Sequence, residues 1–309
     1  MPKLLTVAHL TDVHLGPIRG FTPRHWSLKR LTGYVNWRRN RRNAYQREVL
    51  DRLVADLRQH VPDHIVVTGD LANIGLPAEL MHGLDWLRSI GEPHAVSVIP
   101  GNHDIYGRLR RDPGTDRWAA YMASCAQGKA WTGGHSGFPY VRQLRQVALI
   151  GVNSAVVTPP MMAWGEVGAE QRERLGRLLD KLGEAGQFRL VLIHHPPLPG
   201  QAKPARALRD AAALEQLLTQ HGAELVIHGH NHLNSLEWRQ SSSGPLPVVG
   251  APSGSLGRPH KREQLARYNL YRIQGPPWRI ELIGRGLTEP GSQVQELERR
   301  TLAPHEPGA

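Results

Sequence analysis

The segment LLTVAHL (residues 4–10) is followed at once by the polar turn TDVHLGP (residues 11–17). The first segment is apolar and rich in strand-forming residues, so it predicts a buried β-strand that delivers Asp12 and His14 at its carboxyl end. Five other apolar runs stop in the same way at polar residues: 64–68, 95–99, 147–152, 189–193 and 224–227. Because loops at the carboxyl ends of parallel strands meet at one edge of a sheet, this pattern predicts a polar site there.

Amphipathic helical segments separate these strands. The clearest span 45–57 and 175–182, and a third is expected at 210–220. This alternation of strand and helix indicates the α/β class. Three later apolar segments predict a more antiparallel second half: 246–249, 269–273 and 278–283.

Composition narrows the classes of protein that this chain can belong to. Its 309 residues are enough for a large core, and the single cysteine, Cys125, excludes an internal disulfide framework or a cysteine-rich zinc module. No apolar run is long enough to span a membrane, and residues 1–10 lack a secretion signal, so we expect a cytoplasmic protein. The net charge of +11 favours an anionic partner.

Candidate metal ligands stand in the loops directly after the apolar runs. The 17 histidines are numerous for this length, and several lie beside Asp, Asn or Gly. Imidazole and oxygen ligands without thiolates suit Zn, Mn, Fe or Co at two adjacent positions. The candidates are Asp12, His14, Asp70, Asn102, His103, His194, His230 and His232.

The order of these short motifs carries a family resemblance. Asp-x-His, Gly-Asp, Gly-Asn-His-Asp, His-x-Pro and Gly-His-x-His follow one another between residues 4 and 252. This series resembles the five-block signature of the calcineurin-like binuclear metallophosphoesterases. The resemblance implies an α/β fold that is a four-layer αββα sandwich of two mixed sheets. We expect one such domain over 1–285 and a disordered tail over 286–309.

The resemblance also assigns the ligands of two divalent transition-metal ions, which we expect to be Mn²⁺, Fe²⁺/Fe³⁺ or Zn²⁺. Asp70 bridges them, and the His-x-Pro spacing selects His194 rather than His195. The first ion is assigned to Asp12, His14 and His232. The second is assigned to Asn102, His194 and His230.

In this family a metal-bridging hydroxide attacks phosphorus, and the resemblance gives His103 the role of protonating the leaving group. Asp104 is expected to orient or tune that imidazole. The substrate contacts expected from the same loops are Asn102, His103 and His195.

Three insertions are candidates for choosing the substrate. Residues 19–47 contain nine basic residues and no acidic one, interleaved with aromatic and aliphatic residues. This basic insert is expected beside the metal site, as a lid or as a contact with an anionic membrane surface. A nucleic acid is a less favoured partner, and a solvated basic face is the plain alternative. A cap-like insert (105–140) and an apolar loop (158–164) follow other strand ends.

The expected function is metal-dependent hydrolysis of a phosphodiester derived from a nucleotide or a phospholipid. The sequence resembles the bacterial branch of class III cyclic nucleotide phosphodiesterases and glycerophosphodiesterases. The first alternative is a lipid-pathway hydrolase similar to the UDP-2,3-diacylglucosamine diphosphatases, which typically have Arg where this chain has His103. A repair nuclease ranks third. The alternative from another class is a non-enzymatic scaffold on membrane or nucleic acid, and a homo-oligomer is left open.

Overall fold

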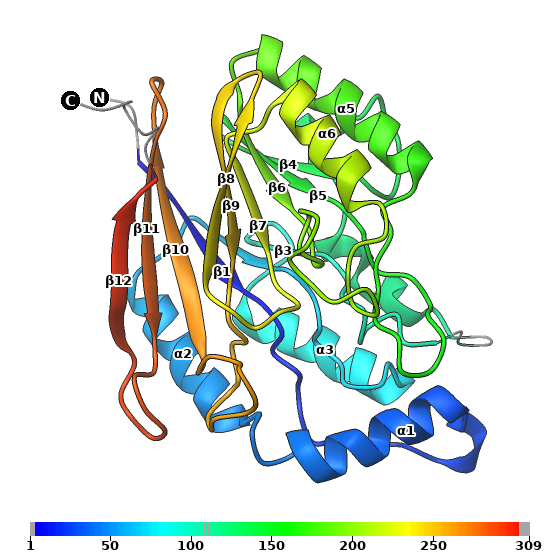
Figure 1. The fold of residues 1–309 in the computed structure, drawn as a ribbon. Helices are drawn as coiled ribbons and strands as arrows, with labels where there is room; N and C mark the ends of the chain where they lie inside the picture. The colour runs from blue at the N-terminus through cyan, green and yellow to red at the C-terminus, as the bar shows by residue number, and fades with distance from the viewer. Residues whose placement is uncertain (1–3, 108, 110–111, 303–309) are drawn as a thin grey trace.

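Two six-stranded sheets pack face to face, with helices covering both outer faces (Figure 1). This computed structural model describes residues 4–107, 109 and 112–302. The predicted four-layer αββα sandwich is confirmed, and both sheets mix parallel and antiparallel strands.

The first sheet has the strand order β12-β11-β10-β1-β2-β3. Strands β1, β2 and β3 are parallel. Strand β10 pairs antiparallel with β1, and β11 and β12 continue the sheet, each antiparallel to the strand before it. In the register, Ala8 of β1 lies opposite both Ile65 and Leu270. The strands are β1 (Leu5–Leu10), β2 (His64–Val67), β3 (Val96–Val98), β10 (Arg267–Gln274), β11 (Arg279–Gly286) and β12 (Gln295–Thr301).

The second sheet has the order β4-β5-β6-β7-β9-β8. Its four central strands are parallel, and the two edge strands are antiparallel to their neighbours. The strands are β4 (Tyr140–Leu144), β5 (Val147–Gly151), β6 (Phe188–Leu192), β7 (Leu225–His228), β8 (Ser235–Ser241) and β9 (Gly244–Gly250).

Helices α2 and α3 cover the first sheet, and α5 and α6 cover the second (Figure 1). Buried leucines of α2 join one core with both sheets, whereas those of α5 and α6 form a second core against the outer face of the second sheet. The helices are α1 (Leu28–Asn36), α2 (Arg47–Gln59), α3 (Pro77–Ile90), α4 (Ala126–Trp131), α5 (Ala169–Glu184) and α6 (Ala211–His221). Shorter helical turns are η1 (Pro23–His25), η2 (Trp37–Arg41) and η3 (Gly114–Tyr121).

The carboxyl-terminal segment differs from the expected disordered tail over 286–309. Residues 295–301 form β12, which pairs along β11. The strand is rich in Glu and Arg because it is an exposed edge, where charges are favoured and an apolar stripe is not needed. Residues 303–309 lie outside the described part of the chain.

Two tryptophans of the cap-like insert over 105–140 pack against the body of the domain. Trp118 is fully buried and donates its indole N–H to the carbonyl of Leu80 in α3, at 2.9 Å. Trp131 of α4 donates to the side chain of Gln143 in β4. These tryptophans therefore fix the described part of the insert to the body of the domain.

Candidate metal centre

The predicted ligands converge at one end of the two facing sheets. The loop after β1 is hydrogen-bonded to the loop after β2, because the amides of Asp12 and His14 donate to the carbonyls of Gly69 and Asp70. From the second sheet, the loop after β7 reaches across, and the amide of His230 donates to Asp12 Oδ2 at 2.9 Å. All seven predicted metal ligands are buried: Asp12, His14, Asp70, Asn102, His194, His230 and His232.

Backbone carbonyls orient three imidazoles in the same way. Nδ1 of His14 lies 3.1 Å from the carbonyl of Ala72, and Nδ1 of His194 lies 2.6 Å from that of Thr68. Nδ1 of His103 contacts the carbonyl of Asn73. A carbonyl can only accept, so each Nδ1 carries the proton and each Nε2 keeps its lone pair. This is the arrangement in which a histidine binds a metal or accepts a hydrogen bond.

His232 is held between two carboxylates. Its Nε2 lies 2.9 Å from Asp12 Oδ1, and its Nδ1 lies 3.2 Å from Glu263 Oε2, which also accepts from the hydroxyl of Tyr45 at 2.6 Å. Burial alone would lower the pKa of His232, but Asp12 and Glu263 outweigh it and raise that pKa to about 9. A carboxylate behind a ligand histidine fixes its ring and raises its basicity.

Asp70 lies at the centre of the cluster. Its Oδ1 accepts from the amide of His103 at 2.7 Å, and its Oδ2 lies 3.9 Å from His14 Nε2 and 3.5 Å from His194 Nε2. Burial raises the pKa of the Asp70 carboxyl, and the neighbouring carboxylates of Asp12 and Asp104 raise it further. Bound cations reverse such a shift, because they favour the ionised carboxylate.

Asp104 has a different role from the one expected. We predicted that it orients the His103 imidazole, but its carboxylate accepts three backbone N–H groups, those of Asp70, Ala72 and Gly101, each at 2.8 Å. It therefore fixes the loop after β2 against the loop after β3. The carbonyl of Asn73 does the orienting of His103 instead.

Acceptor atoms face one another where the second ion is predicted. Nε2 of His194 lies 3.2 Å from Asn102 Oδ1 and 3.2 Å from Nδ1 of His230, which can donate to it, and burial lowers the pKa of His194. Nε2 of His230 is buried and finds no hydrogen-bond partner among the residues that the structure describes. A buried acceptor without a donor is unfavourable unless a cation lies beside it, so Nε2 of His230 fits a metal ligand.

The spacing of ligand atoms supports the same conclusion. The candidate atoms of Asp12, His14 and His232 lie within 4.8 Å of one another, and so do those of Asp12, Asp70 and His194. The donors are nitrogen and oxygen without thiolates, a set that suits divalent transition metals.

His195 lies close to His194 and His230, but both of its ring nitrogens are already hydrogen-bonded. Its Nδ1 pairs with the hydroxyl of Ser154 at 2.8 Å, and its Nε2 with the carbonyl of Ala163 at 3.2 Å. Both ring nitrogens are therefore used to support neighbouring loops. This differs from the expectation that His195 contacts substrate, whereas Asn102 and His103 do line the cavity at the site.

Arg41 is the site residue that the sequence did not reveal. It is one of nine basic residues between 19 and 47, and no motif distinguishes it. In the structure its guanidinium lies 2.8 Å from His14 Nε2 and 3.1 Å from His103 Nε2, over the ring of Tyr45. The basic insert therefore reaches into the centre of the site.

The site loops hold their residues in an unusual backbone conformation. Five of the predicted ligands have positive φ, although none is a glycine: Asp12 (50°), His14 (38°), Asp70 (57°), His230 (68°) and His232 (55°). Such a conformation costs about 1 kcal/mol or more for each non-glycine residue. The surrounding hydrogen bonds maintain it, so the ligand directions are set before any ion binds.

Two cavities adjoin the site. The first, of about 150 Å³, is lined by Arg41, Asp70, His103, Asn36 and Ala163 among others. The second, of about 530 Å³, has His14 among its lining residues. Its basic lining residues are Arg42, Arg47 and Arg258.

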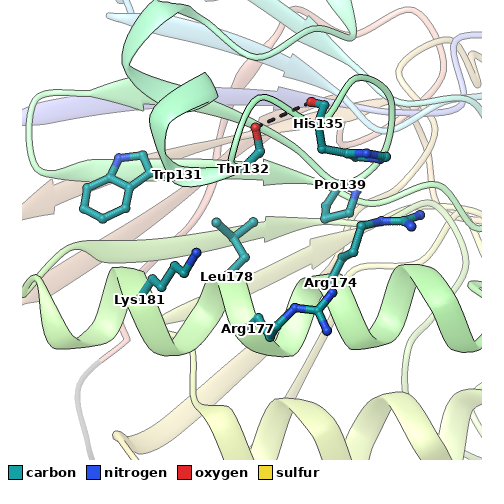
Figure 2. Close-up of a pocket in the computed structure, with 8 residues that line it drawn as sticks. All are labelled: Trp131, Thr132, His135, Pro139, Arg174, Arg177, Leu178 and Lys181. Atoms are coloured by element: carbon teal, nitrogen blue, oxygen red, sulfur yellow. Dashed lines mark hydrogen bonds between the residues drawn. The ribbon is translucent and has the colours of Figure 1, made fainter.

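A third cavity, of about 140 Å³, lies apart from these, between the segment after α4 and helix α5 (Figure 2). Arg174, Arg177 and Lys181 of α5 line it, but Arg174 and Arg177 are paired with glutamates of their own helix. None of the predicted metal ligands is among its lining residues.

Known proteins resemble this chain in sequence and in fold. The model of the calcineurin-like phosphoesterase family matches residues 5–234. A probable cyclic nucleotide phosphodiesterase from Synechococcus is 28% identical over 204 residues, covering 65% of this chain and 68% of that protein. The glycerophosphodiester phosphodiesterase GpdQ of Enterobacter lignolyticus is 25% identical, covering 79% and 77%. A dimetal phosphatase from Danio rerio superposes with a TM-score of 0.64 at 15% identity, covering 97% and 98% of the two chains.

Proposed function

We propose that this chain, which belongs to the calcineurin-like phosphoesterase family, hydrolyses phosphodiesters at a site that holds two divalent metal ions. The convergence of buried acceptors at the end of the two sheets supports this most directly. In particular, burial lowers the pKa of His230, and its Nε2 presents a buried lone pair that no described donor satisfies. The likeness to two bacterial phosphodiesterases favours a diester over a monoester.

The residues divide between the two ions as the family resemblance implies. Asp12, His14 and His232 would hold one, with Asp70 shared. Asn102, His194 and His230 would hold the other. When bound, such ions lower the pKa of a coordinated water and offset the negative charge of phosphate oxygens.

The protein itself supplies a guanidinium and an imidazole for the phosphate. Nε2 of His14 has one lone pair, and a metal ion bound there would take the place of Arg41, whose guanidinium would then be available to phosphate oxygens. Nε2 of His103, which lies 3.1 Å from Arg41, would then be free to take up a proton and donate it to the leaving group. Tyr106 stacks on the His103 ring and limits its rotation.

Hydrolysis of bis(p-nitrophenyl) phosphate and of p-nitrophenyl phosphate tests the proposal. We expect metal-dependent cleavage of the diester, abolished by a chelator and restored by Mn²⁺ or Zn²⁺. The Asp70→Asn variant preserves the shape of the side chain but removes the shared charge, so its rate should fall at least about 100-fold. The matched control is Asp85→Asn, which changes an exposed carboxylate that pairs with Arg88.

The outcomes are distinguishable. A preference for the monoester would contradict the diester assignment. Equal rates for Asp70→Asn and Asp85→Asn would contradict the metal centre itself.

A lipid diphosphate is the second candidate substrate. The cavity beside His14 favours it, because Arg42, Arg47 and Arg258 could bind a second anionic group. Faster turnover of a diphosphate ester than of any single-phosphate diester would support this candidate.

A further inference from the structure

Helix α1 of the basic insert exposes its apolar face and buries charged residues, which is the reverse of an ordinary surface helix. Leu28, Leu31 and Val35 lie at positions i, i+3 and i+7 and therefore share one face. Their exposed fractions are 67%, 44% and 40%. The buried residues of the helix are instead charged, Lys29 and Arg30.

Polar contacts hold the helix in this orientation. The Lys29 ammonium donates to the hydroxyl of Thr158 at 2.7 Å, and the Arg30 guanidinium donates to the carbonyls of Ile74 and Gly75 at 3.3 Å. Turning the helix over would break these bonds and leave buried acceptors unsatisfied. The apolar face is therefore fixed outward, where water is an unfavourable neighbour.

A second exposed apolar segment adjoins the first. Met161 is 83% exposed, and Val157 and Met162 are 45% and 41% exposed. The Lys29–Thr158 hydrogen bond joins this loop to α1, and the hydroxyl of Thr158 in turn donates to the carbonyl of Met162. We call α1 with Trp26, together with the loop 157–162, the apolar rim.

Exposed basic residues lie in the insert that carries α1 and in two loops near the apolar rim. The first loop accepts hydrogen bonds from the amides of Ala163 and Gly165. The second is the loop after β9, whose Lys261 lines the same cavity as Asn36. None of the nine basic residues within 19–47 has an acidic neighbour in that segment. The exposed basic residues are Arg19, Arg24, Arg38, Arg39, Arg42, Lys203, Arg206, Arg209, Arg258, Lys261 and Arg262.

The rim adjoins the cavity at the site. Asn36 is the last residue of α1 and Ala163 directly follows the apolar loop, and both line the cavity that contains Asp70 and His103. Figure 1 shows α1 at the edge of the molecule, beyond α3 and away from the sheets. A flat surface in contact with the rim would therefore lie over the entrance to the site.

We infer that the apolar rim docks on an anionic lipid bilayer, with the mouth of the site facing the lipid. Exposed leucines, methionines and a tryptophan insert at the level of the headgroups, and the arginines and lysines bind the acidic headgroups. The partner must bury the exposed leucines and also bind the nearby cationic side chains. An anionic lipid surface does both, whereas an apolar protein surface would leave the cations without counter-charges.

Sedimentation with vesicles tests this directly. Native protein should bind phosphatidylcholine vesicles that contain phosphatidylglycerol, bind pure phosphatidylcholine much more weakly, and dissociate as salt is added. In the double variant Leu28→Asp/Leu31→Asp, binding should fall at least about 100-fold, since each leucine contributes about tenfold. Leu28 begins the helix, where Asp is compatible with the helical N-terminus.

Matched controls separate docking from folding and from catalysis. Val61→Asp changes an apolar residue that is 80% exposed but lies before β2, at the opposite end of that strand from the site, and should bind vesicles normally. The Asp70→Asn variant should also bind normally, so a failure of the proposed hydrolysis leaves docking intact. The double variant should hydrolyse soluble bis(p-nitrophenyl) phosphate at the native rate.

Three results would overturn the inference. Vesicle binding that is unaffected by Leu28→Asp/Leu31→Asp would mean that lipid contacts another surface. Binding of DNA without binding of vesicles would assign the basic residues to nucleic acid. A stable dimer in light scattering that the double variant dissociates, without vesicle binding by either form, would make the rim a subunit interface.

Discussion

Helices α1 and α5 use amphipathic sequences in opposite ways. In α5, Leu175, Leu179 and Leu182 are buried against the second sheet, and Glu173 and Arg177 are exposed. In α1, Lys29 and Arg30 are buried and Leu28 and Leu31 are exposed. The difference shows that apolar periodicity predicts a helix and its two faces, but the packing partner decides which face is buried.

Those partners differ in chemistry. The face below α5 consists of apolar strand residues such as Ile150 and Val191. The surface below α1 offers the backbone carbonyls of Ile74 and Gly75 and the hydroxyl of Thr158, which need donors. Long basic side chains supply those donors. Hydrogen bonds therefore stabilise the packing of α1, whereas apolar burial stabilises the packing of α5.

The largest expected effect tests this contrast through stability. Leu179→Asp places an unpaired charge in the core below α5 and should destabilise the protein by about 4 kcal/mol or more. Leu31→Asp makes the same change on the outer face of α1 and should alter the free energy of unfolding by less than about 0.5 kcal/mol. Urea titration measures both. Comparable losses for the two variants would mean that the outer face of α1 is packed in solution.

A smaller effect is expected from the arginines of η2, next to α1. Arg41→Ala should lower kcat/KM for the diester about 100-fold, because it removes the charged donor that we propose binds the phosphate. Arg41→Lys should restore part of this loss. Arg39 belongs to the same turn but is exposed, so Arg39→Ala should stay within about twofold of native. If Arg41→Ala and Arg39→Ala behave alike in steady-state kinetics, Arg41 does not act on substrate.

The smallest effect concerns the pH dependence of the contact below α1. Burial and then the nearby Arg30 lower the pKa of Lys29 from 10.5 to about 8. Below pH 8 the ammonium is charged whether α1 is docked or not. Between about pH 8 and 10.5 the undocked form binds more protons, so docking becomes more favourable as pH rises.

Hydrogen exchange over residues 28–36 measures this docking. After correction for the intrinsic rate, protection should increase from pH 7 to pH 10 in the native protein. Lys29→Met has no charge to lose, so its protection should stay level over the same range. A decrease in the protection of the native protein with pH would contradict the predicted direction. A parallel increase in Lys29→Met would mean that another group causes the pH dependence.

Much of the fold and of the site could be predicted from the polar residues that directly follow the apolar strands. Asp12, His14 and Asp70 follow apolar runs directly, and parallel strands must bring their carboxyl ends together, so short motifs were enough to predict which residues meet. Arg41 was not predictable, because its position depends on how far the insert folds back, which no local pattern encodes. The strand β12 was missed for a related reason: a charged edge strand has the composition of a tail.

The misassigned roles have a physical cause as well. Asp104 stands next to His103 in sequence, but adjacent side chains in a turn diverge, and its carboxylate is used by backbone amides. For the same reason His194 and His195 face different partners. Neighbours in sequence therefore share a loop without sharing a function.

The left-handed backbone at the predicted ligands has a consequence for how such a chain can change over generations. Glycine at the position of Asp12 would relax the φ of 50°, but it would also leave the amide of His230 and Nε2 of His232 without their acceptor. Loss of this one ligand would therefore weaken the hold on two others. The predicted ligands depend on one another for folding as well as for chemistry, so a descendant that loses one would tend to lose the order of the whole cluster.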